Sequence, residues 1–249
     1  MNILLTNDDG YKASGINQLF KSLSAEHKVF LIAPRENCSG MSAAISLRKE
    51  IKVEEISKNI FSVSGTPADC SYLGLLSVIP EPIEMIVSGI NLGANLGEDV
   101  FYSGTVGAAI AGRRLNYVPV AFSVAAYNPK NLTYIAEQSL LITNQASQLP
   151  ADQNLLVNVN FPDLPASKIK GIKITSLGKR GMPDTPDLIR AKDSIKFYSF
   201  GPPGTLLPDQ VGTDIQAIEQ NYISISILDY NLSADFAHWD LYKEVFNCE

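Results

Sequence analysis

Two adjacent carboxylates, Asp8 and Asp9, follow the first apolar run of the chain and precede Gly10. The apolar residues 3–5 predict a short buried strand, and the polar residues after them predict the turn that ends it. Neighbouring carboxylates repel each other, and a hard divalent cation bound between them is an economical source of the missing positive charge. An Asx turn in which one Asp caps the next helix is the alternative explanation of the doublet.

Two further polar loops follow candidate strands, and each contains a side chain that could bind the same cation. Ser39 lies in a loop after the apolar residues 29–32, and Asn91 lies in a Gly-rich loop after residues 83–86. In an open parallel sheet the loops after the strand ends build the ligand site, so these loops could gather Ser39, Asn91 and the carboxylate pair around one point. All four side chains offer oxygen, and no His or Cys stands among them. This set favours magnesium, manganese or calcium over zinc.

A candidate anion site occurs at Ser103, Gly104 and Thr105, at the start of a predicted helix that continues over residues 106–115. The first-turn amides of a helix have no partner within it, and together with the helix dipole they attract anions. Gly104 would allow a phosphate to approach the backbone closely. Ordinary helix capping by Ser103 or Thr105 is the alternative, because both residue types are common caps.

Strand and helix patterns alternate along the first two thirds of the chain. This alternation predicts an α/β fold with a doubly wound, Rossmann-like, mostly parallel sheet. Alternation typical of antiparallel strands replaces it after residue 169. We therefore expect a single domain, with a core over residues 1–168 and a hairpin extension with a closing helix (residues 235–246) over residues 169–249. The expected strands are residues 2–6, 27–32, 83–87, 118–124 and 155–159 with an edge hairpin within 45–63, and the expected helices are residues 16–24, 66–78, 106–115 and 131–148.

The composition argues against several classes of protein. The chain of 249 residues has a net charge of -6 and no run of basic residues, which argues against duplex nucleic acid as a partner. No apolar run approaches the roughly 20 residues that span a bilayer. No leader precedes the first strand, so we expect a cytoplasmic protein without a membrane partner. Cys38, Cys70 and Cys248 lack metal-ligand spacing and are expected to be free thiols.

Five short motifs occur in order along the chain. They are Thr6-Asn7-Asp8-Asp9-Gly10, Ser39-Gly40, Ser64-Gly65-Thr66-Pro67-Ala68-Asp69-Cys70, Ser88-Gly89-Ile90-Asn91 and Tyr102-Ser103-Gly104-Thr105-Val106. Together these strings resemble the SurE family, the metal-dependent acid phosphatases called 5'/3'-nucleotidases or survival protein E. The resemblance extends from the first residue to the region of Tyr222, and several separate motifs in the right order make chance agreement a poor explanation.

The resemblance implies an enzyme, a phosphoric monoester hydrolase that dephosphorylates nucleoside 5'- and 3'-monophosphates, with short polyphosphate as a further substrate. Asn95 and the segment 103–105 would bind the substrate phosphate. SurE-like proteins exchange a C-terminal hairpin between subunits, so we expect a homodimer or a homotetramer. The resemblance also implies one divalent metal ion (Mg, Mn or Ca) per subunit, with the ligands Asp8, Asp9, Ser39 and Asn91.

The expected mechanism uses a metal-activated water. The cation polarises a phosphoryl oxygen and lowers the pKa of a bound water, and a carboxylate of the pair, preferably that of Asp9, acts as the general base. The amides of Gly104 and Thr105 stabilise charge on the phosphoryl oxygens. An aspartyl-phosphate phosphatase, with a nucleophilic Asp and a second acid two residues later, is one alternative. A non-catalytic nucleotide-binding sensor is the other. A dinucleotide-binding dehydrogenase is disfavoured, because no Gly-x-Gly-x-x-Gly loop follows the first strand.

Other polar residues receive structural interpretations. His27 and His238 are expected to be surface or packing residues. Lys179 and Arg180 lie between two glycines in a loop that could close over a phosphorylated substrate. A solvated turn is the more common role of such a pair and is favoured.

Overall fold

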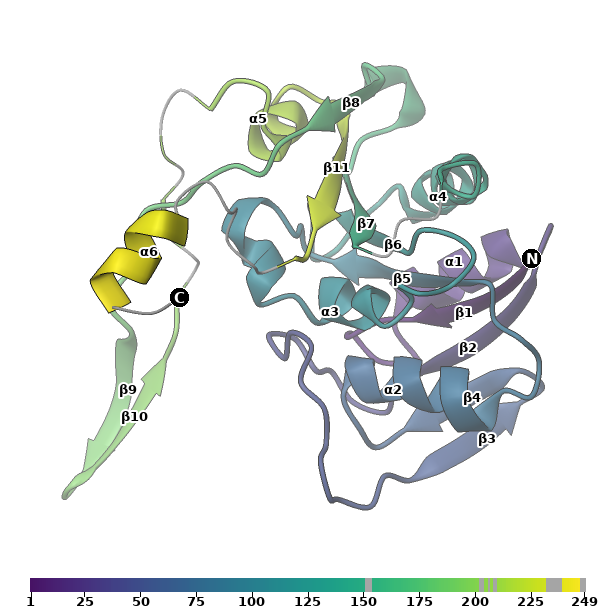
Figure 1. The fold of residues 1–249 in the computed structure, drawn as a ribbon, viewed down its shortest axis with the longest axis horizontal. Helices are drawn as coiled ribbons and strands as arrows, with labels where there is room; N and C mark the ends of the chain where they lie inside the picture. Colours follow the sequence, from purple (N-terminus) through teal and green to yellow (C-terminus); the bar gives the residue numbers. More distant parts are fainter. Residues whose placement is uncertain (151–153, 202–203, 206, 208–209, 232–238, 247–249) are drawn as a thin grey trace.

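A nine-stranded sheet forms the centre of the molecule (Figure 1). The computed structural model describes residues 1–150, 154–201, 204–205, 207, 210–231 and 239–246. In sheet order, the strands are β3 (Val53–Ser57), β4 (Ile60–Val63), β2 (Lys28–Pro34), β1 (Asn2–Thr6), β5 (Met85–Leu92), β6 (Val120–Val124), β7 (Leu155–Phe161), β11 (Ile223–Asp229) and β8 (Ile172–Thr175).

Six consecutive strands of this sheet, from β4 to β7, are parallel. The edge strand β3 is antiparallel to β4, and together they form the hairpin expected within residues 45–63. Every other strand and helix expected before residue 168 is also present, with bounds that differ by a few residues. The predicted doubly wound, mostly parallel α/β fold is therefore confirmed, and the carboxyl ends of the central strands meet at one edge.

The central strands are apolar on both faces, so alternate residues of each strand enter different cores. Leu4 packs in one cluster with Cys70 of α2 (Pro67–Leu73). Ile3 packs in the other with Ile16 of α1 (Ser14–Leu23) and Ile135 of α4 (Leu132–Ala146). Burial on both faces is typical of parallel strands and explains their continuous apolar runs. The remaining core helix is α3 (Gly104–Ile110), which packs against α2.

The last third of the chain differs in part from the expected hairpin extension. β8 and β11 belong to the central sheet; β11 is antiparallel to β7, and β8 is parallel to β11. Among the described residues of this region, only β9 (Asp187–Lys192) and β10 (Ile195–Ser199) form a separate antiparallel hairpin. Two-residue alternation identified strands but not their partners, because a half-buried edge strand and a hairpin strand share that pattern.

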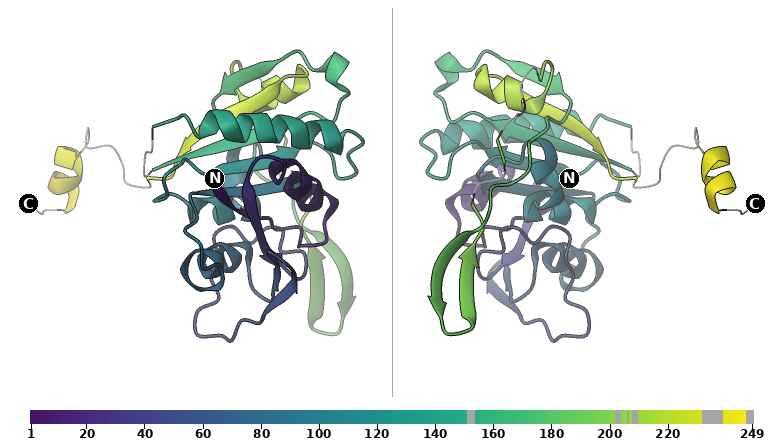
Figure 2. Two further views of the ribbon diagram at one scale, coloured as in Figure 1. Left: turned by 90° about the vertical axis from the view of Figure 1, so that its right-hand side faces the viewer. Right: turned by 90° about the vertical axis from the view of Figure 1, so that its left-hand side faces the viewer.

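The hairpin β9–β10 and the helix α6 (Trp239–Phe246) stand away from the sheet (Figure 2). The expected closing helix therefore exists from Trp239, and its first four expected residues lie outside the described residues. Among the described residues, no helix has the length and apolar character needed to cross a membrane.

Candidate functional site

The turn after β1 is closed by Asn7, which leaves both following carboxylates for other contacts. The Asn7 side chain donates to the Gly10 carbonyl at 3.0 Å and accepts from the Gly10 amide at 3.2 Å. The N-cap of α1 is Ala13, and it makes no side-chain capping bond. The Asx turn thus belongs to Asn7, and neither Asp8 nor Asp9 caps the next helix.

The carboxylate of Asp8 is buried against the start of α3. Asp8 is 3% exposed, and the hydroxyl of Thr105 donates a short hydrogen bond to its Oδ1. A Cβ atom at Gly104 would lie 2.8 Å from the Asp8 Cβ and 2.9 Å from its Oδ2. The glycine therefore makes room for this carboxylate. Burial, with a smaller contribution from the charge of Asp9, raises the pKa of Asp8 from 3.8 to about 6.

The carboxylate of Asp9 joins the loop after β2 to the end of β5. Its Oδ2 accepts the amide of Leu92 at 3.0 Å, and its Oδ1 accepts the side-chain amide of Asn37 at 3.3 Å. Burial raises the pKa of Asp9 as well. Within the described part of the chain, no Lys or Arg forms an ion pair with Asp8 or Asp9. The pair is consequently a concentration of negative charge without a protein cation beside it.

Ser39 is placed next to this pair by its two preceding neighbours. The Cys38 amide donates to the main-chain oxygen of Asp8 at 2.7 Å. The side chain of Asn37 accepts the Ser39 amide at 2.9 Å while it donates to Asp9. Ser39 itself is exposed. Asn37 was not identified from the sequence, although its place in the polar loop beside Ser39 was the available signal.

The side-chain oxygen of Asn91 has no hydrogen-bond partner among the described residues. The amide nitrogen of the same side chain donates to the carbonyl of Gly93 at 2.7 Å, so the side-chain oxygen points elsewhere. The next residue, Leu92, is the one bonded to Asp9. The structure thus brings the turn after β1, the loop after β2 and the carboxyl end of β5 together. Asn91 lies inside β5 and not in a loop after it, because the strand continues to Leu92 instead of ending at residue 87.

The loop that contains Ser39 is also anchored by the Ser64–Cys70 motif. The Asp69 carboxylate accepts the amide of Ser46 at 2.9 Å, and the Thr66 hydroxyl donates to the carbonyl of Ala44 at 2.6 Å. Thr66 and Asp69 form a capping box at the start of α2, which confirms the expected N-cap at Thr66. Hydrogen bonds from this motif therefore hold the second half of the Ser39 loop against the start of α2.

The side chains of the predicted anion site have protein partners. Ser103 accepts the Val106 amide at 3.1 Å and so caps α3, as its alternative interpretation expected. The Thr105 hydroxyl donates its hydrogen bond to the Asp8 carboxylate. Asn95 is 6% exposed, and its amide nitrogen donates to the Ser123 hydroxyl at 2.8 Å. Because Ser103 uses the Val106 amide, what remains for an anion is the amides of Gly104 and Thr105 and the second amide hydrogen of Asn95.

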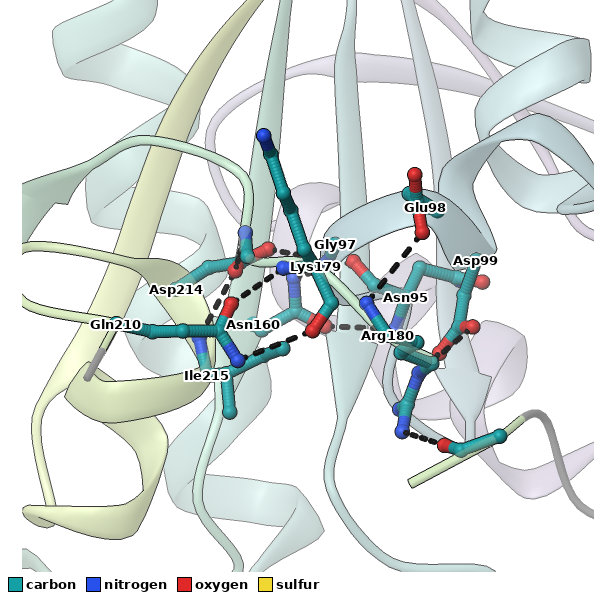
Figure 3. Close-up of polar contacts among 12 residues, drawn as sticks. Asn95, Gly97, Glu98, Asp99, Asn160, Lys179, Arg180, Gln210, Asp214 and Ile215 are labelled. Carbon is teal, nitrogen blue, oxygen red and sulfur yellow. Dashed lines mark hydrogen bonds and ion pairs between the residues drawn. The ribbon is translucent and has the colours of Figure 1, made fainter. Parts of the chain in front are cut away.

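The other candidate residues lie outside this group. Arg180 forms an ion pair with Asp99 at 2.9 Å, and the Lys179 side chain extends away from that contact (Figure 3). His27 precedes β2, at the opposite edge of the sheet, and burial lowers its pKa. Cys38 and Cys70 are free thiols, as expected. His238 and Cys248 lie outside the described residues.

The acidic content of the site is limited to the Asp pair. Among the described residues, no group of three or more His, Cys, Asp or Glu side chains could hold a metal ion. A cation here would therefore also need the neutral oxygens of Ser39 and Asn91. Such a mixed oxygen set fits a hard cation, which accepts amide and hydroxyl oxygens together with carboxylates.

Comparisons with known proteins agree with the motifs and the fold. The family described as "Survival protein SurE" matches residues 3–184. The 5'-nucleotidase SurE of Pseudoalteromonas atlantica is 40% identical over 244 residues, which cover 94% of both chains. The 5'/3'-nucleotidase SurE of Wigglesworthia glossinidia brevipalpis is 41% identical and covers 94% of this chain and 93% of its own. A crystal structure of the SurE protein from Aquifex aeolicus has a TM-score of 0.84 at 32% identity and covers 99% of this chain and 100% of its own. Agreement of this extent shows that the chain belongs to the survival protein SurE family.

Proposed function

We propose that the protein is a divalent-metal-dependent nucleotidase that hydrolyses nucleoside 5'- and 3'-monophosphates, with short polyphosphate as a further substrate. The observation that supports it most is the Asp8–Asp9 pair, in which Asp8 is buried and Asp9 half-buried, and which lacks a basic partner among the described residues. Relatives that align with almost the whole chain are named 5'-nucleotidase or 5'/3'-nucleotidase.

The proposal assigns the cation to Asp8, Asp9, Ser39 and Asn91. Magnesium, manganese or calcium bound there would act as a Lewis acid on a phosphoryl oxygen and would lower the pKa of a water. The orientation of Asn91, whose nitrogen is used by Gly93, supports a ligand role for its oxygen. The raised pKa of Asp8 supports it too, because a burial cost of this kind is offset by a cation.

The carboxylates and the amide groups of the site have separate roles in the proposed hydrolysis. The Asp9 carboxylate would accept the proton of the attacking water as the new P–O bond forms, and the nucleoside oxygen would take up a proton from solvent as the ester P–O bond breaks. The amides of Gly104 and Thr105 and the free amide hydrogen of Asn95 donate to the phosphoryl oxygens. Asp8 keeps its place through Thr105.

A panel of substrates and metals tests the activity itself. Nucleoside 5'- and 3'-monophosphates and short polyphosphate are supplied with magnesium, manganese or calcium, and released phosphate is measured. Hydrolysis of the monophosphates is expected. Binding of the same nucleotides without hydrolysis under any metal would instead identify the sensor alternative.

The reaction is expected to pass through no phosphoenzyme. Asp8 is held by Thr105 and buried to 3% exposure, and adjacent acids suit cation binding better than the two-residue spacing of an aspartyl-phosphate phosphatase. Acid-quenched single turnovers with a labelled phosphate ester should leave no label on the protein. Stoichiometric labelling would favour the aspartyl-phosphate alternative.

Asn91 and Asn95 should respond differently to substitution. Asn95→Ala is expected to weaken transition-state binding by about 1.5–3 kcal/mol, the value of one hydrogen bond to a charged group, with metal affinity almost unchanged. Asn91→Ala should instead raise the manganese concentration needed for half-maximal activity. Each variant is titrated with manganese at saturating nucleotide. A metal curve shifted by Asn95→Ala and not by Asn91→Ala would show that the two assignments are reversed.

The protein is expected to be a homodimer or homotetramer in solution. The β9–β10 hairpin pairs with no other described strand and exposes Leu188, Ile189 and Ile195, which are 52%, 63% and 59% accessible. An isolated two-stranded hairpin has little stability in water, so a partner surface is needed. Light scattering at micromolar concentration should give a mass of two or four chains. Ile189→Lys should weaken assembly, whereas Leu76→Lys, at a 79% exposed position of the core, should not.

A further inference from the structure

A buried carboxylate outside the Asp8–Asp9 site holds two distant segments together. Asp214 is 0% exposed and begins α5 (Asp214–Glu219). Its Oδ2 accepts the amide of Gly97 at 2.7 Å, and its Oδ1 accepts the amides of Gly178 and Ile215, both at 2.8 Å (Figure 3). The cap of α5 is Thr213, which accepts the Gln216 amide, so Asp214 is not needed for that role.

The two segments joined by Asp214 approach each other too closely for side chains. A Cβ atom at Gly97 would lie 2.6 Å from the carbonyl oxygen of Gly178, and Gly97 has a φ of 55°. Gly97 is two residues beyond Asn95. Asp214 thus acts on the main chain beside the proposed phosphate-binding residue.

A second contact connects the same segments. The guanidinium of Arg180 donates to the Asp99 carboxylate through Nε at 3.0 Å and Nη2 at 2.9 Å, and it also reaches the carbonyl of Gly204 (Figure 3). The two side chains of the ion pair are 20% and 19% exposed. Both ends of the turn that follows Asn95 are therefore tied to the chain between β8 and β11.

The central sheet holds Asn95 from the other side. Its amide donates to the side-chain oxygen of Asn160 at 2.8 Å, and its carbonyl accepts the side-chain amides of Asn158 and Asn160, both at 3.0 Å. The main chain of Asn95 is thereby fully bonded within the protein. With Asp214 at Gly97, the segment 95–97 is fixed on two sides.

The burial of the charged Asp214 carboxylate costs free energy of folding, and a structural role in packing does not require a charged group at this position. Burial raises the pKa of Asp214 even though three amides donate to it. Removing a charge from water costs free energy that hydrogen bonds must offset. A role in the reaction would account for a charged group at this position.

We propose that Asp214 is a positioning residue of the nucleotidase reaction: it fixes the main chain of residues 95–97 and thereby orients the Asn95 side chain toward the substrate phosphate. The inference rests on the proposed function, because it needs Asn95 to bind phosphate. It places control of the phosphate site in the chain segment between β8 and β11.

The substitution Asp214→Asn tests the proposal. The side-chain oxygen of Asn can accept the main-chain N–H of either Gly97 or Gly178. Its NH₂ group then faces the N–H of the other glycine, and two donors repel each other. We expect kcat/KM for a nucleoside monophosphate to fall about 10- to 100-fold, the effect of a small misplacement of a contacting group. The manganese concentration for half-maximal activity should stay unchanged.

Asp163→Asn is the matched control. Asp163 also accepts main-chain amides, those of Lys130 and Asn131 at 2.9 and 3.0 Å, in the loop before α4. Its loss should lower the unfolding midpoint in urea without a change in kcat/KM. An equal kinetic loss in both variants would show a general effect of destabilisation and would overturn the proposal.

A double-mutant cycle with Asn95→Ala decides whether Asp214 acts through Asn95. In the Asn95→Ala background, Asp214→Asn should change kcat/KM less than twofold. Additive losses, or no loss from Asp214→Asn in the wild-type background, would overturn the positioning role while the proposed function stands. If Asn95→Ala leaves kcat/KM unchanged, its phosphate contact is wrong and the positioning role fails with it.

Arg180→Gln provides a second variant if Asp214→Asn does not fold. It removes the ion pair at the other end of the contact, where both side chains are partly exposed and loss of folding is less of a concern. The expected loss of kcat/KM is about 3- to 10-fold, and it should vanish in the Asn95→Ala background. A folded Arg180→Gln protein with wild-type kcat/KM would contradict the proposal.

Discussion

Asp8→Asn and Asp9→Asn should each lower phosphatase turnover by about 10²–10³-fold, and chelation of divalent metals should do the same to the wild-type protein. Each change removes either a charge that holds the cation or the cation itself. The measurement is phosphate release from a nucleoside monophosphate, before and after excess chelator, with manganese or magnesium then restored. Restoration should recover the wild-type protein but not the variants. Full turnover in excess chelator would exclude the proposed metal dependence.

The Asp8→Asn protein should remain folded, and without metal it should be more stable than the wild type. The pKa of Asp8 rises from 3.8 to about 6 in the folded state, so metal-free stability falls as pH rises through that interval and the full cost is present above pH 6. At neutral pH, relief of that cost corresponds to about 1–3 kcal/mol. Thermal unfolding at pH 7 and at pH 4 should show the gain at pH 7 only. A gain that is equal at both pH values would be inconsistent with this explanation.

Gly104→Ala should have the second large effect, a loss of about 10²-fold in activity. The added Cβ atom would lie 2.8 Å from the Asp8 Cβ, closer than such atoms approach, so the carboxylate must leave its position against Thr105. Steady-state phosphate release and a manganese titration measure the loss. The curve should shift to higher metal concentration, since the displaced group is a proposed ligand.

Gly201→Ala is the matched control for that change. A Cβ atom at Gly201 would meet no atom within 4 Å, and its φ does not lie in the left-handed region. The control protein should keep wild-type activity. Normal activity and a normal metal curve in Gly104→Ala would mean that the position of Asp8 seen here is not required for the reaction.

The sequence was sufficient to predict that the segments of Asp8, Ser39 and Asn91 meet at one edge of the sheet. Each segment contains an apolar strand pattern, and parallel strands bring their carboxyl ends together, so local patterns predicted a long-range arrangement. The end of the third strand was misplaced, because β5 continues to Leu92 and includes Asn91. The structural role of Gly104 was harder to predict from the sequence. A glycine before a helix suggests room for a phosphate, but the structure places the carboxylate of Asp8 there, and that residue lies far away in the sequence.

The supports of the site could not be predicted because they act over long sequence separations. Asp214 reaches Gly97 across 117 residues, and Asn160 reaches Asn95 across 65. Neither residue belongs to a polar loop motif: Asn160 lies in the strand β7, and Asp214 follows a helix cap. The pairing of β8 with β11 was missed for the same reason, since a strand pattern carries no information about its partner.

The order of strands at the far edge of the sheet has a consequence for biosynthesis. β11 lies between β7 and β8, so β8 has no neighbour in the sheet until β11, which is made after it, has emerged from the ribosome. Until then β7 is an open edge with unsatisfied backbone groups, the kind of surface that pairs with other chains. Pairings of this separation form slowly, because the chain between them must first be closed into a loop. A nascent chain that ends before residue 223 therefore carries an incomplete sheet, whose β7 edge is open to pairing with other chains.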